Sequence, residues 1–455
     1  MDTLQPKLTQ GSIVKSLTLF ALPYLAANFI QALYGAVDLA IVGWFTDAAG
    51  ISAVSIGTQV MQIVTSLVSG LTLGGTVLIA QYFGARREQD VRHTIGTMLG
   101  MFAAAAGAFT LIMCLACGGI LRLLQTPAQA FAQAYQYVLI CSLGILFIFG
   151  YNAISAVLRG VGDSKSPMLF VAIACVCNIV LDLLLVGPLQ MGAAGAALAT
   201  VASQAVSMVI AIVYLRRRAF LFDFKLKSLR IHREQTTRLL KLGLPISLQE
   251  SLVHLSFMII TAIVNNMGVI ASAAVGVAGK FEGFAMLPAT AFAAAISAMV
   301  AQNMGAGEKG RAEKTLYTGI AIAFGCSVLF FIWAQVAPVS ILAIFKADAL
   351  VSQAGAQYLR SFSYDFMLVA FVFCMNGFFN GCGRTTFSMV NGLLSTFLVR
   401  VPLALLFSNL WPDSLTGIGL AAPLASFVSI VVGFIYIRTR RWVHGSIGAA
   451  PDEAA

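Results

Sequence analysis

The run SLTLFALPYLAANFIQALYGAVDLAIVGWF, residues 16–45, decides the class of fold. Asp38 is its single charged side chain. A helix needs roughly 20 apolar residues to cross a bilayer, so this run is long enough to span a membrane. It is too long for the apolar part of a signal peptide and has no convincing cleavage site. We therefore predict that it is the first transmembrane helix and is retained in the mature protein.

Similar apolar runs fill the rest of the 455 residues, separated by short polar breaks. Hydrophobic residues make up 59% of the chain and charged residues only 10%, with a mean hydropathy of +0.89. A soluble domain of this size needs more polar surface than that. The runs are rich in Ala, Gly and Leu without strand-like alternation, which predicts an all-α integral membrane protein of twelve helices. All eight cysteines lie in or beside these runs, and we expect them to be packing residues.

The net charge of +10 follows the membrane topology. Lys and Arg cluster in alternate connections, for example at 86–92, 216–241, 309–314 and 438–441, and are absent from 46–50, 187–191, 265–268 and 408–417. This is the positive-inside pattern of a membrane protein, and it argues against nucleic acid as the partner. It predicts that both termini are cytoplasmic.

The two halves of the chain resemble each other. Pro23 matches Pro245 at an offset of 222, while AQYFGA (80–85) matches AQNMGA (301–306) and RGVG (159–162) matches NGCG (380–383) at 221. We therefore predict two parallel six-helix lobes related by a pseudo-two-fold axis along the membrane normal. The expected boundaries are 1–215 for the first lobe, 216–241 for a basic cytoplasmic linker, 242–440 for the second lobe and 441–455 for a tail.

Charged and polar side chains inside the spans are candidates for function, because burying them in a bilayer is costly. Asp38 lies about seven residues below the outer end of the first span. Asp182, Asn178 one turn below it, and Thr200 lie at a similar depth in the fifth and sixth spans. Two carboxylates, an amide oxygen and a hydroxyl form a set of ligands suited to a proton or to sodium.

Four segments resemble those of the multidrug and toxic compound extrusion (MATE) family: AVDLAIVG (36–43), AQYFGA (80–85), LRGVGDSKSPM (158–168) and GAAGAALAT (192–200). The resemblance covers nearly the whole chain. It implies twelve helices in two lobes, and export of amphipathic, usually cationic compounds against inward flow of protons or sodium ions.

The resemblance also extends to individual residues. Asp38, Asn178, Asp182 and Thr200 match the cation site in the first lobe of the family's DinF-like branch. Gln31 matches a position that lines the substrate cavity, although an interhelical hydrogen bond explains it equally well. Asp38 is expected to contact substrate as well as the cation. Pro23 removes a backbone hydrogen bond and is expected to permit bending of the first helix or simply to shape a static kink.

The second lobe does not repeat the acidic site, because Ile260 and Leu403 stand at the positions of Asp38 and Asp182. We therefore expect cation coupling in the first lobe only. The second lobe has other charged residues within its spans, and whether they form a second cation site stays an open alternative: Glu250, Lys280, Glu282, Asp365 and Arg400. Glu250 and His254 lie four residues apart on one face, but with only four histidines in the chain a metal site is not expected.

These observations predict a secondary multidrug antiporter of the bacterial inner membrane that works by alternating access. We expect it to act as a monomer, with small-molecule drugs or toxic metabolites as partners and with no cofactor beyond the coupling proton or sodium ion. One alternative is a flippase for lipid-linked oligosaccharides, which would require several cavity cations. An intramembrane enzyme is another, and would require paired catalytic residues at one membrane face. The sequence contains no phosphate-binding Gly-x-x-x-x-Gly-Lys motif near 160–166.

Overall fold

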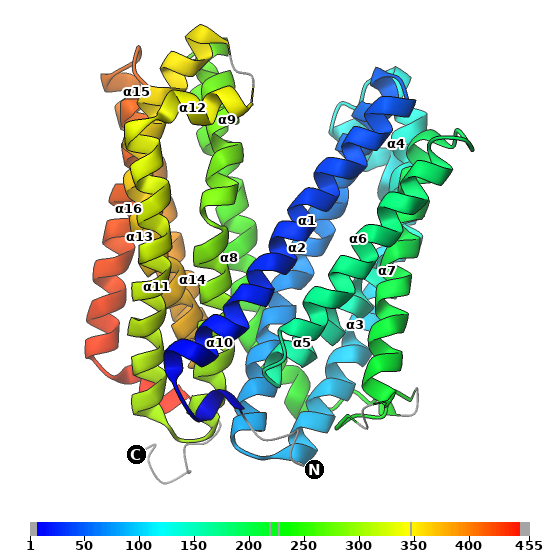
Figure 1. Ribbon diagram of the computed structural model, residues 1–455, viewed down its shortest axis with the longest axis vertical. Helices are drawn as coiled ribbons and strands as arrows, with labels where there is room; N and C mark the ends of the chain where they lie inside the picture. Colours follow the sequence, from blue (N-terminus) through cyan, green and yellow to red (C-terminus); the bar gives the residue numbers. More distant parts are fainter. Residues whose placement is uncertain (1–6, 218–219, 226–227, 346–347, 446–455) are drawn as a thin grey trace. The chain divides into compact units, whose positions relative to one another are not determined.

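The computed structural model describes residues 7–217, 220–225, 228–345 and 348–445. Within these residues it is built from helices (Figure 1). The long helices are α1 Ile13–Phe45, α2 Ala48–Gly84, α3 Glu88–Leu123, α4 Ala128–Leu143, α5 Ile145–Gly160, α6 Lys165–Leu185, α7 Gly192–Arg217, α8 Arg233–Asn266, α9 Val269–Ala285, α10 Leu287–Gly305, α11 Lys309–Val336, α13 Ala349–Gly381 and α16 Thr416–Arg438. The shorter elements are η2 Lys7–Thr9, α12 Pro338–Ile344, α14 Thr385–Leu393, η4 Leu394–Arg400, α15 Val401–Leu410 and η5 Arg441–Gly445.

The number of membrane spans agrees with the twelve predicted. Eleven helical segments of the described chain are long and apolar enough to cross a bilayer, and α4 with α5 forms a twelfth that bends by 49°. The bend falls at Gly144, which ends α4 and begins α5. A side chain at Gly144 would collide with Val201 of α7, so close packing requires glycine there.

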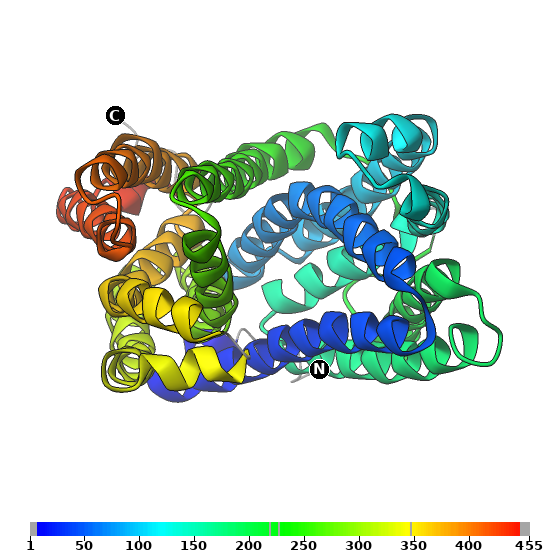
Figure 2. The same cartoon turned by 90° about the horizontal axis from the view of Figure 1, so that it is seen from above.

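The chain forms two compact units, and each unit contains part of a helix that continues into the other. Unit 1 comprises Met1–Leu25 and Leu248–Ala455, and unit 2 comprises Ala26–Ser247. Figure 2 shows the helices of each unit grouped side by side. The units differ from the predicted lobes 1–215 and 242–440, because the first part of α1 packs with the second half of the sequence and the first part of α8 packs with the first half. Of the predicted tail, 446–455 lies outside the described residues.

The beginning of α1 is held in unit 1 by apolar packing and by one arginine. Leu17 and Phe20 are buried in a core shared with Phe292, Ile296 and other side chains of α10, α11 and α13. The Arg311 guanidinium at the start of α11 donates hydrogen bonds to the carbonyl oxygens of Gly11 (2.8 Å) and Gln10 (2.9 Å). The segment before α1 is therefore fixed to unit 1.

The beginning of α8 is held in unit 2 in a comparable way. Gly74 of α2 and Gly243 of α8 approach so closely that a Cβ at Gly74 would lie 2.8 Å from the Gly243 Cα. The Ser247 hydroxyl donates to the Leu67 carbonyl oxygen at 2.9 Å. These contacts join α8 directly to α2.

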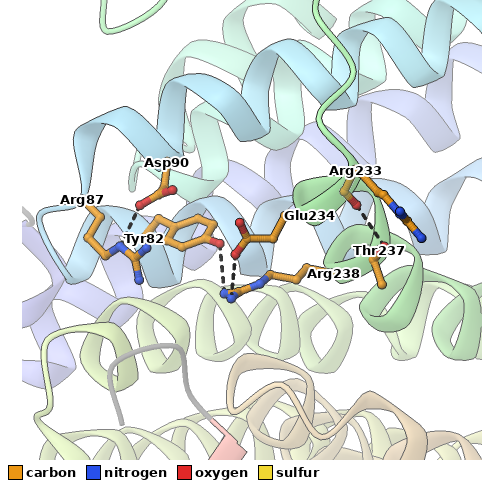
Figure 3. Close-up of polar contacts among 7 residues, drawn as sticks. All are labelled: Tyr82, Arg87, Asp90, Arg233, Glu234, Thr237 and Arg238. Atoms are coloured by element: carbon orange, nitrogen blue, oxygen red, sulfur yellow. Dashed lines mark hydrogen bonds and ion pairs between the residues drawn. The ribbon is translucent and has the colours of Figure 1, made fainter. Parts of the chain in front are cut away.

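Polar side chains extend this attachment to the first turn of α8, as Figure 3 shows. The Arg238 guanidinium donates to the Tyr82 hydroxyl at 3.0 Å and pairs with Glu234 at 2.8 Å. Arg87 lies over the same tyrosine ring, 5.2 Å from its centroid, and pairs with Asp90 at 2.7 Å. The predicted linker 216–241 thus includes residues that are part of unit 2.

One span of unit 1 contains a π-helical turn, η4. Pro402 follows it and has no N–H to donate to an α-helical hydrogen bond. The Val401 N–H bonds instead to the Thr396 carbonyl oxygen, five residues back. The turn places Arg400 at its last position.

Candidate functional site

The site in unit 2 begins with Asp38, the single acidic residue of α1. Asp38 lies seven residues before the end of α1 at Phe45, and only 5% of its surface is exposed. The residues around it in α1 are almost entirely apolar, and such a sequence forms a membrane helix irrespective of this one charge. The helix therefore places a carboxylate inside the apolar part of the unit.

Two further polar residues come from α6. Asp182 and Asn178 lie four residues apart, hence on one face of the helix, and both are completely buried. The Asp38 and Asp182 carboxyl groups interact with each other, and Asp182 also interacts with Asn178. The structure thus brings together three of the residues that the sequence singled out.

Thr200 of α7 reaches the same site through Tyr34, a residue that the sequence analysis did not select. The Tyr34 hydroxyl donates to Thr200 Oγ1 at 3.1 Å, and Tyr34 also interacts with Asp38 and Asp182. Tyr34 lies one turn before Asp38 on α1, so the four-residue spacing was a signal that could have identified it.

Tyr137 of α4 is a second tyrosine beside the acidic pair. It is buried, interacts with Asp38, and its hydroxyl lies 3.2 Å from Thr58 Oγ1. The sequence carries no signal for it except at the repeat offset of 221, which aligns Tyr137 with Tyr358 of α13.

The chemistry of the site follows from its missing hydrogen bonds. Asp38 Oδ1, both carboxylate oxygens of Asp182 and both polar side-chain atoms of Asn178 are buried without a hydrogen bond of regular geometry in the described structure. Buried polar groups are normally paired, and two facing carboxylates repel each other when both are ionised. The residues present fit a proton shared between the acids or a hard monovalent cation bound by oxygen.

Two other predicted residues of α1 lie apart from this pair. Gln31, the expected cavity residue, has an exposed side chain. Pro23 lies inside α1, two residues before the point where the chain passes from unit 1 into unit 2. Pro245 of α8 occupies the matching position, just before the boundary between Ser247 and Leu248.

Unit 1 contains a different set of buried charges. Glu282 of α9 and Asp365 of α13 are 7% and 4% exposed, and both interact with Arg400 of η4. The Arg400 guanidinium also lies over the Phe257 ring, 4.4 Å from its centroid. Lys280 and His254 are exposed, and the described residues include no group of three or more His, Cys, Asp or Glu arranged to hold a metal ion.

A protein-family model named MatE matches this chain twice, over residues 23–184 and 245–406. The two matched segments begin at Pro23 and Pro245, the prolines that the internal repeat aligns. The repeat predicted from three short motifs is therefore confirmed across both halves.

Whole-length relatives agree with this match. "Probable multidrug resistance protein YpnP" of Bacillus subtilis is 29% identical over 95% of this chain and 97% of its own length. "Probable multidrug resistance protein NorM" of Thermotoga maritima is 25% identical over 92% of this chain and 91% of its own. Among solved structures, an outward-facing multidrug resistance MATE family transporter superposes with a TM-score of 0.89 at 23% identity, covering 95% of this chain and 97% of that one.

Proposed function

This chain belongs to the MatE family and is a multidrug efflux transporter rather than an enzyme, and we propose that it exports each drug in exchange for a cation held between Asp38 and Asp182. The observation that carries the proposal is the buried pair of interacting carboxyl groups, in which Asp38 Oδ1 and both Asp182 oxygens lack a hydrogen bond of regular geometry in the described structure. A bilayer helix tolerates a central aspartate at a cost of about 3 kcal/mol. Two such residues facing each other need a function that offsets this cost.

In this mechanism the coupling cation and the drug compete for the same acidic groups. The cation is a proton or a sodium ion, with Asn178 and Thr200 supplying further oxygen ligands. Tyr34 orients Thr200 through its hydroxyl group. Entry of the cation from outside neutralises the carboxylates and weakens their attraction for a cationic drug, so that the drug leaves on that side. We propose on the same ground that the chain belongs to the DinF-like branch of the family, whose first-lobe cation site these residues resemble.

Bending of α1 at Pro23 links the site to the change of access. A proline within a helix removes one backbone hydrogen bond and is a common point of bending. The chain passes between the compact units at Leu25 and Ala26, directly after this proline. A change in the charge state at Asp38 is therefore transmitted along the same helix toward the point where the units join. Gln31, exposed between Pro23 and Asp38, contacts the drug during this step.

We place both termini in the cytoplasm and expect the transporter to work as a monomer. The positive-inside distribution of Lys and Arg supports this orientation. Contacts within unit 1 also support it: Arg311 binds the Gly11 carbonyl oxygen, and Glu313 on the same turn of α11 lies 3.9 Å from Arg440. The beginning of α1 and the segment after α16 therefore lie at the same end of unit 1.

Competition between cation and drug is the test of this function. We expect the affinity of the purified transporter for a fluorescent organic cation such as ethidium to fall when protons or sodium ions are added, because linked binding is reciprocal. Asp38→Asn should bind the dye independently of both cations. Asp413→Asn, in an exposed loop between α15 and α16, is the control and should respond like the native protein. A native protein whose dye affinity ignores both cations would refute the proposal.

A further inference from the structure

The second buried acidic pair, in unit 1, differs from the first in having a built-in cation. Glu282 of α9 and Asp365 of α13 are both more than nine-tenths buried, and Glu282 Oε1 and Asp365 Oδ1 lack hydrogen bonds in the described structure. Arg400 acts electrostatically on both carboxyl groups, without a direct ion pair to either in the described part of the chain. The first pair, Asp38 and Asp182, has two tyrosines beside it, but among the described residues no arginine or lysine acts on it.

Local structure fixes the position of Arg400. The π-helical turn η4 ends at this residue, and π-turns change which face of a helix the following side chains occupy. The Phe257 ring lies 4.4 Å from the guanidinium and holds it by a cation–π interaction. An arginine remains charged in proteins under all ordinary conditions, so its positive charge is a permanent part of unit 1.

The charge balance of the two units therefore differs. With one proton shared by each pair, the Asp38–Asp182 pair keeps one negative charge. The Glu282–Asp365 pair with one proton is neutralised by Arg400. An unpaired buried charge is far more costly than a paired one, so the first pair must gain a second cation from solution and the second pair need not.

We propose that Arg400 is a tethered counter-ion that takes the place of an exchangeable cation in unit 1 and so restricts coupling to the acidic pair of unit 2. The tyrosines that the repeat aligns, Tyr137 and Tyr358, lie beside the two pairs, with Tyr137 interacting with Asp38 and Tyr358 with Glu282. The two units thus keep a related tyrosine but differ in the source of positive charge. Arg400 is a specificity-determining residue that sets how many cations are exchanged. This inference rests on the proposed coupling at Asp38 and Asp182.

The test uses the full-length protein carrying Asp38→Asn and Asp182→Asn, so that the first pair cannot respond. Its thermal unfolding in detergent is compared in sodium chloride and choline chloride at pH 8, and at pH 6 and pH 8 in choline chloride. We expect neither sodium nor acid to stabilise this parent. Adding Arg400→Gln should create a response to sodium or to acid, with the melting temperature rising by at least about 2 °C. Arg400→Lys keeps the charge and should behave like the parent.

Arg360→Gln, at an exposed position of α13, is the matched control for loss of an arginine. Any change in melting temperature that it shows is subtracted from the change measured for Arg400→Gln. An Arg400→Gln protein that folds and responds to sodium and acid like the parent would overturn the proposal. If Arg400→Gln does not fold, Glu282→Gln and Asp365→Asn are each added to the parent instead. If neither substitution changes how the melting temperature depends on sodium and acid, the proposal is supported. If the parent responds to sodium or acid and either substitution abolishes that response, the proposal is refuted.

The outcomes of these unfolding experiments distinguish failure of the role proposed for Arg400 from failure of the function proposed for Asp38 and Asp182. A cation response that persists in Asp38→Asn/Asp182→Asn and does not depend on Glu282 or Asp365 contradicts the coupling role of the first pair and leaves the role of Arg400 intact. A response that depends on Glu282 or Asp365 contradicts the role of Arg400.

Discussion

At the scale of single residues, the site consists of groups that destabilise the protein unless a cation joins them. Asp38 and Asp182 interact directly while several of their oxygens lack hydrogen bonds. Repulsion between facing carboxylates and the loss of hydration both oppose folding. The pair is therefore expected to show the conflict between stability and activity that marks functional sites.

This conflict predicts that Asp182→Asn makes the protein more stable and less active. The amide has nearly the shape of the carboxylate, removes the like charge and supplies a donor to Asp38. We expect the melting temperature of the purified protein to rise by about 1 °C, equivalent to roughly 1 kcal/mol. The control Asp413→Asn should stay within about 0.5 kcal/mol of the native protein, as surface substitutions do. A clear fall in the melting temperature of Asp182→Asn would show that the pair is a structural contact.

The hydrogen bond between Tyr34 and Thr200 gives a second prediction. Tyr34→Phe and Thr200→Val each remove one partner of this 3.1 Å contact. We expect each to weaken cation binding, and the double variant to be no worse than the single ones, with a coupling free energy of about 1 kcal/mol. The measurement is the cation concentration that half-displaces a bound fluorescent drug. Additive losses in the double variant would mean that the two side chains act separately.

The acidic residues of this site could be selected from sequence directly, whereas the tyrosines left only indirect signals, the spacing of Tyr34 to Asp38 and the repeat position of Tyr137. A carboxylate in an apolar run is conspicuous because its burial is costly. A tyrosine in such a run is ordinary, since its ring is apolar and its hydroxyl can find a partner in many places. Tyr34 and Tyr137 become part of the site only when α1 and α4 are placed in three dimensions.

At the scale of helices, α1 and α8 are the elements that join the compact units. Each carries a proline, Pro23 or Pro245, just before the residue at which it leaves one unit and enters the other. Pro423, by contrast, lies inside α16, which belongs entirely to unit 1. The position of a proline relative to the unit boundary should therefore decide its effect on transport.

We predict that Pro23→Ala and Pro245→Ala slow transport at least about tenfold without changing cation affinity. Alanine restores a backbone hydrogen bond and opposes bending, a change worth on the order of 1–3 kcal/mol. Pro423→Ala should leave the transport rate close to native. The rate of drug export from proteoliposomes and the equilibrium cation affinity are measured on the same preparations. Equal effects of all three substitutions would indicate general damage to helix packing.

Span positions were predictable from hydropathy, whereas interruptions within spans were not. Hydropathy indicated twelve helices, yet three of these spans contain the bend at Gly144, the break between α9 and α10, and the π-turn η4. At Gly144 the packing depends on a contact made elsewhere, with Val201 of α7. Hydropathy averages over such local features and cannot locate them.

At the scale of the whole molecule, the units defined by contact do not follow the lobes 1–215 and 242–440 predicted from sequence. The family model matches segments that begin at Pro23 and Pro245. The two boundaries between the units lie within three residues of these prolines. Sequence similarity reports common descent of the halves, whereas compactness reports which side chains pack together. The exchanged helix beginnings, with Leu17 buried in unit 1, could not be inferred from the repeat alone.

The orientation of the chain gives a prediction for the intact cell. In a variant without native cysteines, Asp413→Cys lies in the loop between α15 and α16, and Lys309→Cys begins α11. A membrane-impermeant maleimide should label Asp413→Cys in intact cells, because loops poor in Lys and Arg face outward. Lys309→Cys should react only after the cells are permeabilised. The reverse pattern would place both termini outside and reverse the proposed direction of cation flow.

The central claim is that Asp38 and Asp182 couple drug export to cation entry, and drug-stimulated cation movement in proteoliposomes tests it most directly. With native protein and with Asp413→Asn, a drug gradient should drive protons or sodium ions in the opposite direction. Asp38→Asn and Asp182→Asn should each reduce this coupled movement at least about tenfold, a change of roughly 1.4 kcal/mol or more. Coupled movement at the native rate in either variant would contradict the account.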